Sequence, residues 1–376
     1  MKNQFLLIIS FFLWTSVACQ NIQTFYTETW VNDNWQKMVK GTNTYDKDDF
    51  LTITSQNNWD TDFNIWDNSF QTFYINNKDG AVTQQITQAW DYLNRNWYSF
   101  ERITYDYNSN KKLSSKLIEN WVKGNWQNVV KDLNNYDSIG NLINSLRHTW
   151  DLVSLSWKNT QQINFTNSSS GKVIEKVTQS WENLLNVWIN NQRITFTYTL
   201  KDKPLTQYTE IWVNGNWQNF ERHNNSYDST GFVINTIEQK WNLDSSRWNN
   251  IKQINYANNL DGTIHQKTMQ TWDNLLKSWN NIERTTFTYN QTSDTNIPRM
   301  PSFSVYPNPS KDIISIKLEN SDLSKVSIID LNGKLLVSHI CSVNEFSINI
   351  NELNPSIYLV RIEQGEKIMI RKFIKN

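Results

Sequence analysis

Tryptophans recur in pairs along most of the chain, and their spacing constrains the fold more than any other feature. Nine pairs lie between Trp30 and Trp279. The gap within a pair follows a cycle of 5, 7 and 7 residues, whereas the gap from one pair to the next is always 24. Equivalent pairs therefore recur every 91 residues, as Trp30, Trp121 and Trp212 do. Such a strict period indicates a repeat architecture in which each unit packs on its neighbours.

Each tryptophan pair brackets a turn, so the repeating unit is predicted to be a β-hairpin. Between Trp212 and Trp217 lies Val-Asn-Gly-Asn, and Asn-Gly is the strongest short hairpin signal because both residues tolerate a positive φ. A two-residue turn at Asn214-Gly215 places the two tryptophans opposite each other at a non-hydrogen-bonded position, where side chains are closest. Where the gap is seven residues, a four-residue loop gives the same pairing.

An acidic residue follows the first tryptophan in five units, next to the predicted loop. Its recurrence at one repeat position indicates a structural role, such as a hydrogen bond within the turn, rather than catalysis. These residues are Asp60, Asp91, Asp151, Glu182 and Asp273.

The segments between the pairs alternate in polarity with a period of two, which is typical of strands. Val173, Val177 and Trp181 share one face of such a segment. We therefore predict an all-β fold in which residues 20–291 form nine hairpins, about eighteen antiparallel strands, in three 91-residue super-repeats. Open sheets rarely exceed about ten strands without curling or splitting, so we expect a curled or coiled sheet with its aromatic face concave.

A propeller is the alternative architecture, although its blades usually take about 40–50 residues. The first of the three 91-residue copies diverges most from the other two, as expected of a capping repeat.

The tryptophan rows are the candidate binding site. Aromatic rows stack on sugar rings, and the flanking Asn and Gln side chains can bond hydroxyl groups, so a surface polysaccharide is the expected ligand class. The competing interpretation is a structural ladder in which the tryptophans pack on each other across strands. The candidate residues come from the two copies that agree best: Trp121, Trp126, Trp150, Trp157, Trp181, Trp188, Trp212, Trp217, Trp241 and Trp248.

The sequence offers no recognisable catalytic or metal-binding pattern. None of the four histidines has metal-ligand spacing with another His or Cys, and neither a Gly-rich phosphate loop nor a Gly-x-Ser-x-Gly elbow occurs. We therefore expect no enzyme activity, no cofactor and no metal. The main alternative to a binding protein is a shell-like structural component of the surface. A hydrolase ranks third, because any sheet can bring two carboxylates together.

Charge argues against a polyanionic partner. The chain has 36 basic and 36 acidic side chains and a net charge of zero, so neither nucleic acid nor an anionic membrane is indicated. Nineteen Trp, 15 Tyr and 17 Phe in a polar chain indicate an ordered protein in which aromatic residues carry much of the burial.

The N-terminus has the pattern of a secretory signal. Lys2 precedes an apolar run from Phe5 to Trp14, and small residues follow. The run is too short to anchor the chain in a bilayer, so we predict a signal peptide over residues 1–19 and no transmembrane segment in the mature chain. A lipoprotein signal with Cys19 acylated is the alternative.

A different domain begins after a polar, proline-containing linker at residues 292–302. From residue 303 onward Trp disappears and short Ile- and Val-rich strands appear, which predicts a small β-sandwich. Four segments resemble the C-terminal sorting domain family of the type IX secretion system: Val305 to Pro309, Asp330 to Lys334, Leu353 to Val360 and Lys372 to Lys375. The family usually has Gly where this chain has Ser356. The motif residues are Tyr306, Pro307, Asn308, Pro309, Gly333, Lys334, Tyr358, Lys372 and Lys375.

The resemblance implies a partner and a destination. Domains of this family direct passage across the outer membrane of Gram-negative bacteria, so the outer-membrane secretion machinery is the expected partner and the cell surface or extracellular space the expected location. The turns Tyr136 to Gly140 and Tyr227 to Gly231 also resemble the tyrosine–aspartate repeats of bacterial toxin shells, which form spiral sheets; no function is transferred from that resemblance.

Overall fold

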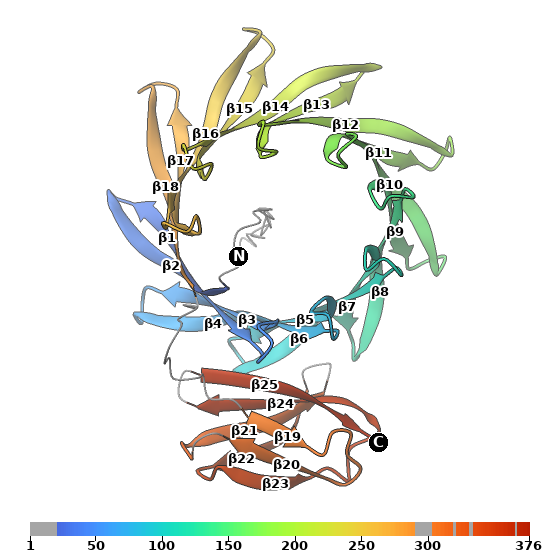
Figure 1. Cartoon of the computed structure of the whole chain (residues 1–376), viewed down its shortest axis with the longest axis vertical. Helices are drawn as coiled ribbons and strands as arrows, with labels where there is room; N and C mark the ends of the chain where they lie inside the picture. Colours follow the sequence, from blue (N-terminus) through green and yellow to red (C-terminus); the bar gives the residue numbers. More distant parts are fainter. Residues whose placement is uncertain (1–20, 290–302, 319–320, 331–333, 365–366) are drawn as a thin grey trace.

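The computed structural model describes residues 21–289, 303–318, 321–330, 334–364 and 367–376. These residues form a closed ring of strands, built by the repeats, and a small two-sheet domain at the C-terminus (Figure 1). The predicted signal peptide with Cys19, the predicted linker and Gly333 lie outside the described residues. Among the residues described, no helix has the length and apolar character that crossing a membrane requires.

The ring consists of nine hairpins, each with a ten-residue first strand and a twelve-residue second strand. The strands are β1 (Ile22–Val31), β2 (Asn34–Tyr45), β3 (Leu51–Asp60), β4 (Ile65–Asn76), β5 (Val82–Asp91), β6 (Asn96–Tyr107), β7 (Leu113–Val122), β8 (Asn125–Tyr136), β9 (Leu142–Asp151), β10 (Ser156–Asn167), β11 (Val173–Glu182), β12 (Val187–Tyr198), β13 (Pro204–Val213), β14 (Asn216–Tyr227), β15 (Val233–Asn242), β16 (Arg247–Asn258), β17 (Ile264–Asp273) and β18 (Ser278–Tyr289).

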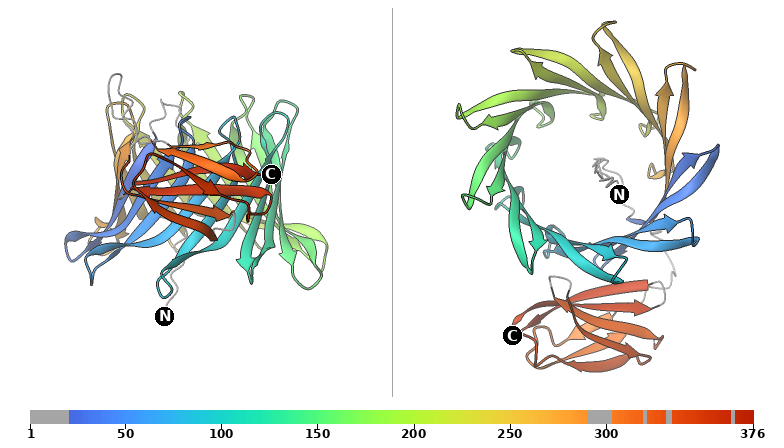
Figure 2. Two further views of the ribbon diagram at one scale, coloured as in Figure 1. Left: turned by 90° about the horizontal axis from the view of Figure 1, so that it is seen from below. Right: turned by 180° about the vertical axis from the view of Figure 1, so that it is seen from behind.

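The sheet closes on itself. Each strand pairs antiparallel with its neighbours in the chain, and β1 also pairs with β18. The register at this seam runs from Ile22 opposite Tyr289 to Thr29 opposite Glu283, and Figures 1 and 2 show the complete ring. The predicted all-β hairpin fold is confirmed. One continuous closed sheet excludes a propeller and leaves no unpaired backbone edge.

The hairpin turns follow the predicted geometry. Trp212 lies opposite Trp217, and the two turn residues between them, Asn214 and Gly215, have φ angles of 50° and 83°. Positive φ at both positions is what a type I′ turn requires. In a four-residue loop, Lys277 has a φ of 55°. The predicted pairing of tryptophans in both loop lengths is confirmed.

Every hairpin carries one β-bulge, which the spacing of the tryptophans did not reveal. Glu210 lies opposite Asn219 and Thr209 opposite Glu221, so Phe220 has no partner. The extra residue reverses the alternation of the second strand beyond it. The unpaired residues of the nine hairpins are Met38, Ser69, Phe100, Val129, Thr160, Asn191, Phe220, Ile251 and Ile282.

The tryptophans lie on the outer face of the ring, so the expectation of a concave aromatic face was wrong. Between Ile53 and Trp59, strand β3 contains no extra residue, so these two residues, six positions apart, share a face. Ile53 packs on Ile329 and Leu359 of the C-terminal domain, which lies outside the ring (Figure 1). Pairs of bulky indoles need lateral space, and the convex face of a curved sheet provides it.

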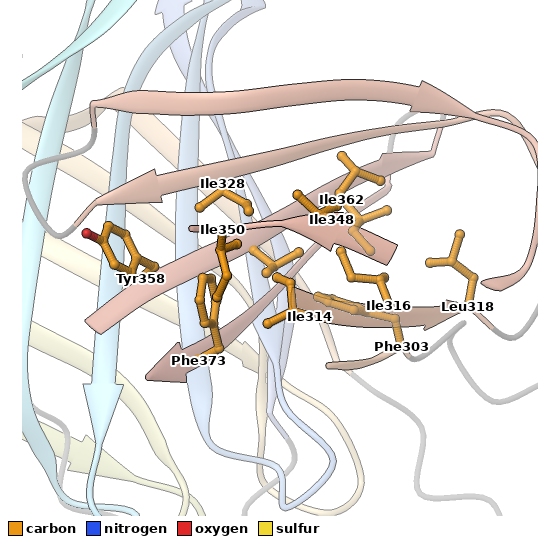
Figure 3. Packing of buried hydrophobic residues seen from close by; sticks show 12 residues of the cluster. Phe303, Ile314, Ile316, Leu318, Ile328, Ile348, Ile350, Tyr358, Ile362 and Phe373 are labelled. Atoms are coloured by element: carbon orange, nitrogen blue, oxygen red, sulfur yellow. The ribbon is translucent and has the colours of Figure 1, made fainter. Parts of the chain in front are cut away.

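The C-terminal domain is a sandwich of two antiparallel sheets, in the orders β19-β20-β23 and β22-β21-β24-β25. Its core includes Phe303, Ile314, Ile328 and Phe373, each no more than 4% exposed (Figure 3). The predicted small β-sandwich is confirmed. The strands are β19 (Phe303–Tyr306), β20 (Ile313–Leu318), β21 (Ser324–Asp330), β22 (Leu335–Cys341), β23 (Glu345–Asn349), β24 (Ser356–Gln364) and β25 (Lys367–Lys375).

Candidate functional site

The ten candidate tryptophans meet two by two on the outer face. In each of the five pairs the indoles are edge to face, with ring centroids 4.9–5.1 Å apart and planes inclined by 64–70°. Each indole is partly buried. Aromatic pairs in this arrangement contribute about 0.5–1.5 kcal/mol beyond their area burial. Every pair therefore stabilises its own hairpin, whatever else it does.

Guanidinium groups cover several of the second indoles. The Cζ atom of Arg193 lies 5.1 Å from the ring centroid of Trp217, which belongs to the next hairpin. The Nε atom of the same arginine donates to Glu210, on the strand between them, at 2.7 Å. Arg102 over Trp126 repeats this arrangement at 4.9 Å. A cation over an indole adds about 0.5–2 kcal/mol, so these groups link successive hairpins.

The same arrangement spans the seam. Arg284 lies 4.6 Å from the Trp35 ring centroid, and its Nε atom donates to Glu28 at 2.8 Å. Arg102, Arg193 and Arg284 are 91 residues apart, so the seam has the same side-chain chemistry as the internal junctions. These arginines were missed from the sequence, although their spacing is a signal that could have identified them.

A ladder of amide side chains lies beside the tryptophans on the outer face. Gln162 Nε2 donates to Gln179 Oε1 at 2.6 Å, and Gln179 Nε2 donates to Asn190 Oδ1 at 2.8 Å. All three side chains are half-buried and retain some contact with solvent. Asn and Gln side chains were expected near the indoles, but these particular residues were not predicted. The equivalents are Gln253, Gln270 and Asn281 in the third copy and Gln71, Gln88 and Ser99 in the first.

The acidic residues after the first tryptophans cap their turns, as predicted. Asp273 Oδ1 accepts the backbone N–H groups of Leu275 and Leu276 at 2.7 and 2.9 Å. These hydrogen bonds lower the pKa of Asp273 below its ordinary value. Asp60, Asp91, Asp151 and Glu182 accept backbone N–H groups in their own turns.

The same turns present aliphatic side chains to solvent. Leu93, Val153, Leu184 and Leu275 are each more than 90% exposed. They lie at the tips of four-residue loops, next to the tryptophan pair of each hairpin. Because each lies on a separate hairpin, these exposed side chains alone do not identify a contact surface.

The opposite end of each hairpin is fastened by one side chain whose role was not predicted from the sequence. The Tyr289 hydroxyl donates to the Ile264 carbonyl at 2.8 Å, and Asn258 Nδ2 donates to the Val233 carbonyl at 2.7 Å. Nine residues, one in each hairpin, make this bond to the first strand. They are Tyr45, Asn76, Tyr107, Tyr136, Asn167, Tyr198, Tyr227, Asn258 and Tyr289.

The inner face carries two side chains with raised pKa values. Burial raises the pKa of Glu101, and burial raises the pKa of Tyr105 to about 12. Within the described ranges, no group of three His, Cys, Asp or Glu residues could hold a metal ion.

Two hollows lie near the tryptophans. One of about 230 Å³ lies beside Asn120 and Trp150, and the other, of about 440 Å³, lies between Trp97 and Lys334.

Residues of the sorting motif fasten the ends of the C-terminal domain. Asn308 Nδ2 donates to the Lys372 carbonyl at 3.0 Å, and Asn308 Oδ1 accepts the Ile374 N–H at 2.8 Å. This side chain, which lies between Pro307 and Pro309, therefore ties the start of the domain to its last strand.

The remaining motif residues make local hydrogen bonds. The hydroxyls of Tyr306 and Tyr358 donate to the Glu345 carboxylate at 2.5 Å and to the Asn354 carbonyl at 2.8 Å. The Lys334 N–H donates to Asp330 at 2.9 Å, and Lys375 Nζ donates to the Asn376 carbonyl at 2.8 Å. These contacts assign a structural role to each motif residue that they involve.

Residues 304–376 match the sequence model of the secretion system C-terminal sorting domain family. This part of the chain is therefore the type IX secretion sorting domain that the motifs predicted, and its presence implies export across the outer membrane. The match covers about a fifth of the chain and leaves the ring unassigned. No curated protein sequence matches the chain.

Several solved structures share limited similarity with the chain. A DUF3836 family protein from Parabacteroides distasonis is 20% identical, with 23% of this chain and 81% of that chain covered and a TM-score of 0.21. A porin-like protein from Bacteroides uniformis is 9% identical, with 72% and 98% covered and a TM-score of 0.28. PorZ, a surface component of the type IX secretion system of Porphyromonas gingivalis, is 10% identical, with 91% and 68% covered and a TM-score of 0.18. TM-scores this low do not establish a shared fold.

Proposed function

We propose that the ring is an exported binding module that attaches to polysaccharide through its outer face. The observation that carries this proposal is the outward placement of the indole pairs beside half-buried amide side chains, repeated in the second and third copies. A structural core would enclose such groups. Here they lie where a large extended ligand can reach them.

The chemistry of this face suits sugars. Indole edges and faces offer apolar area to the C–H side of a pyranose ring, and amides both donate and accept hydrogen bonds with hydroxyls. Aromatic residues combined with a few oriented polar groups are typical of ligand sites. The proposed role is binding without catalysis, with delivery to the cell surface or extracellular space by the sorting domain.

A structural role for the ring is the second candidate, and a specific observation favours it. Each indole pair is satisfied edge to face, and Arg193 and Arg222 cover Trp217 and Trp248. Under this second candidate, the ladder holds the hairpins together and binds no ligand. The two candidates differ in whether the outer face has affinity for any soluble glycan.

Binding of the full chain to an array of bacterial polysaccharides tests the proposal. Asn164 and Asn255 lie on the outer face at equivalent positions, so the double variant Asn164→Ala/Asn255→Ala should weaken binding about tenfold, as expected when a hydrogen bond is lost at each site. Gln161→Ala is the matched control, because Gln161 is a polar residue of β10 on the opposite face from Asn164.

The expected result is binding by the wild-type and control chains and weaker binding by the double variant, with unchanged circular dichroism in all three. A correctly folded wild-type chain that binds no polysaccharide would favour the structural candidate. Equal losses in the control and the double variant would show that the binding site does not lie on the outer face.

A further inference from the structure

We propose that the outer face of the first copy is a docking site built for the chain's own sorting domain. Docking explains why the first copy differs from the other two. Divergence was expected there because terminal repeats usually act as caps, but a closed ring has no terminal repeat that needs capping. The residues that differ instead lie where the domain packs.

The ring side of the contact is apolar in the first copy alone. Ile53 and Phe73 are cross-strand partners on β3 and β4, 2% and 5% exposed beneath the domain. At the equivalent positions the second copy has Asn144 and Asn164, joined by a hydrogen bond of 2.7 Å. The third copy likewise has an amide pair, joined at 2.8 Å: Asn235 and Asn255.

The polar side chains next to this apolar pair are also covered in the first copy. Gln71 and Gln88 are 3% and 2% exposed, whereas their equivalents in the other copies are half-buried. The two remain hydrogen-bonded to each other at 2.6 Å, so burial leaves their amides satisfied. Ile86 is 3% exposed, and its equivalents Val177 and Thr268 are half-buried.

The sorting domain presents a matching apolar face. Ile329 and Leu359 are cross-strand partners on β21 and β24, and both are packed against Ile53 and Phe73. Their chain neighbours Ile328 and Val360 are fully buried in the core of the domain. At these positions the sheet is therefore apolar on both faces. Strands with two apolar faces are typical of sheets that are covered on both sides, and here the ring is the second cover.

The connection in the chain favours docking within one molecule. Thirteen residues join Tyr289 to Phe303, so the domain remains close to its site. A connection of this length gives an effective concentration of about millimolar, and a contact of modest affinity is then largely formed. The outer face of the first copy is thus covered by the sorting domain. The corresponding faces of the other two copies have amide pairs where the first copy has Ile53 and Phe73.

Small-angle X-ray scattering of the full chain tests the proposal. Ile53→Asn/Phe73→Asn gives the first copy the residues that the other copies already accommodate, so the ring should fold. Loss of two buried apolar side chains should lower the docked-to-undocked ratio about 100-fold, which appears as a larger radius of gyration. The control is the double variant Leu146→Ser/Val177→Thr in the second copy. Each new residue already occurs at the equivalent position of another copy, as Ser55 in the first and Thr268 in the third. This variant should scatter like the wild type.

A photo-cross-linking experiment keeps the proposal testable if the double variant does not fold. Benzoylphenylalanine in place of Phe73 in the full chain should form cross-links to peptides from β21 or β24, detected by mass spectrometry. Unchanged scattering of a folded Ile53→Asn/Phe73→Asn variant would overturn the proposal. Cross-links confined to the ring would also overturn it.

Discussion

Closure of the ring depends on a contact between the two ends of the repeat region, and Glu28→Ala should weaken it selectively. Glu28 accepts hydrogen bonds from Nε and Nη2 of Arg284 at 2.8 and 2.5 Å. The two side chains are 26% and 28% exposed, so water screens the pair only in part. Removing one partner of such a charged hydrogen bond costs about 1.5–3 kcal/mol.

That cost should appear as local opening of the seam. A loss of about 1.5–3 kcal/mol raises the opening equilibrium about 10- to 150-fold, since about 1.4 kcal/mol corresponds to a factor of ten. Hydrogen–deuterium exchange should therefore accelerate by this factor in β1 and β18, which are far apart in sequence. Glu210→Ala removes the equivalent pair between β12 and β13, whose connecting turn spans only residues 199–203. The short connection should limit opening there.

The chain contains its own conservative control. Arg222 lies over Trp248 and donates to Gln239 at 2.7 Å, so an amide replaces the carboxylate in a junction that still forms. Glu28→Gln should consequently raise seam exchange less than tenfold. The reasoning would be refuted if Glu28→Ala left hydrogen–deuterium exchange in β1 and β18 unchanged. It would also be refuted if Glu28→Gln accelerated this exchange as much as Glu28→Ala does.

Three further predictions concern the hairpins. Tyr289→Phe removes a hydroxyl bonded to a backbone carbonyl and should lower the free energy of unfolding in urea by about 0.5–1.5 kcal/mol; no change would mean that the bond is not formed in solution. Trp217→Ala should lower the free energy of unfolding by about 2–3 kcal/mol in the same measurement, because it removes a half-buried indole together with its edge-to-face contact and its contact with an arginine. A folded variant of unchanged stability would contradict a structural role. The lowered pKa of Asp273 means that its stabilisation is present above the unfolded pKa of 3.8 and is lost as pH falls through the lower folded value. Asp273→Asn should therefore flatten the dependence of the melting temperature on pH below 3.8, and an identical pH dependence in the variant would exclude this contribution.

Much of the local structure could be predicted from the sequence because it depends on near neighbours. The tryptophan spacing located all nine turns, since the residues that pair across a hairpin are separated by only five or seven positions. The acidic turn residues were identified for the same reason, because Asp273 bonds backbone groups two and three residues away. The sorting domain was recognised from four short segments in the order that the family uses.

The candidate site was only partly predictable. Each pair of indoles was expected and observed, but the guanidinium and amide groups that surround them come from neighbouring hairpins. Arg193 reaches Trp217 across an intervening strand, and a bulge at the unpaired residue of each hairpin decides which side chains share that face. A pattern of alternation along one strand does not contain this information, because the bulge shifts the alternation by one.

Closure, the direction of curvature and the docking of the sorting domain were decided by the tertiary structure alone. Each of them depends on contacts between residues far apart in sequence: Glu28 meets Arg284, and Ile53 meets Leu359. The curvature that brings such residues together accumulates over eighteen strands, and a small change in twist per strand would leave the sheet open. The repeating hairpin and the sorting domain follow from local sequence patterns. The twist between neighbouring strands, summed over the sheet, determines that the hairpins form a ring with the tryptophans outside. Only a closed ring lets the first and last strands form backbone hydrogen bonds with each other.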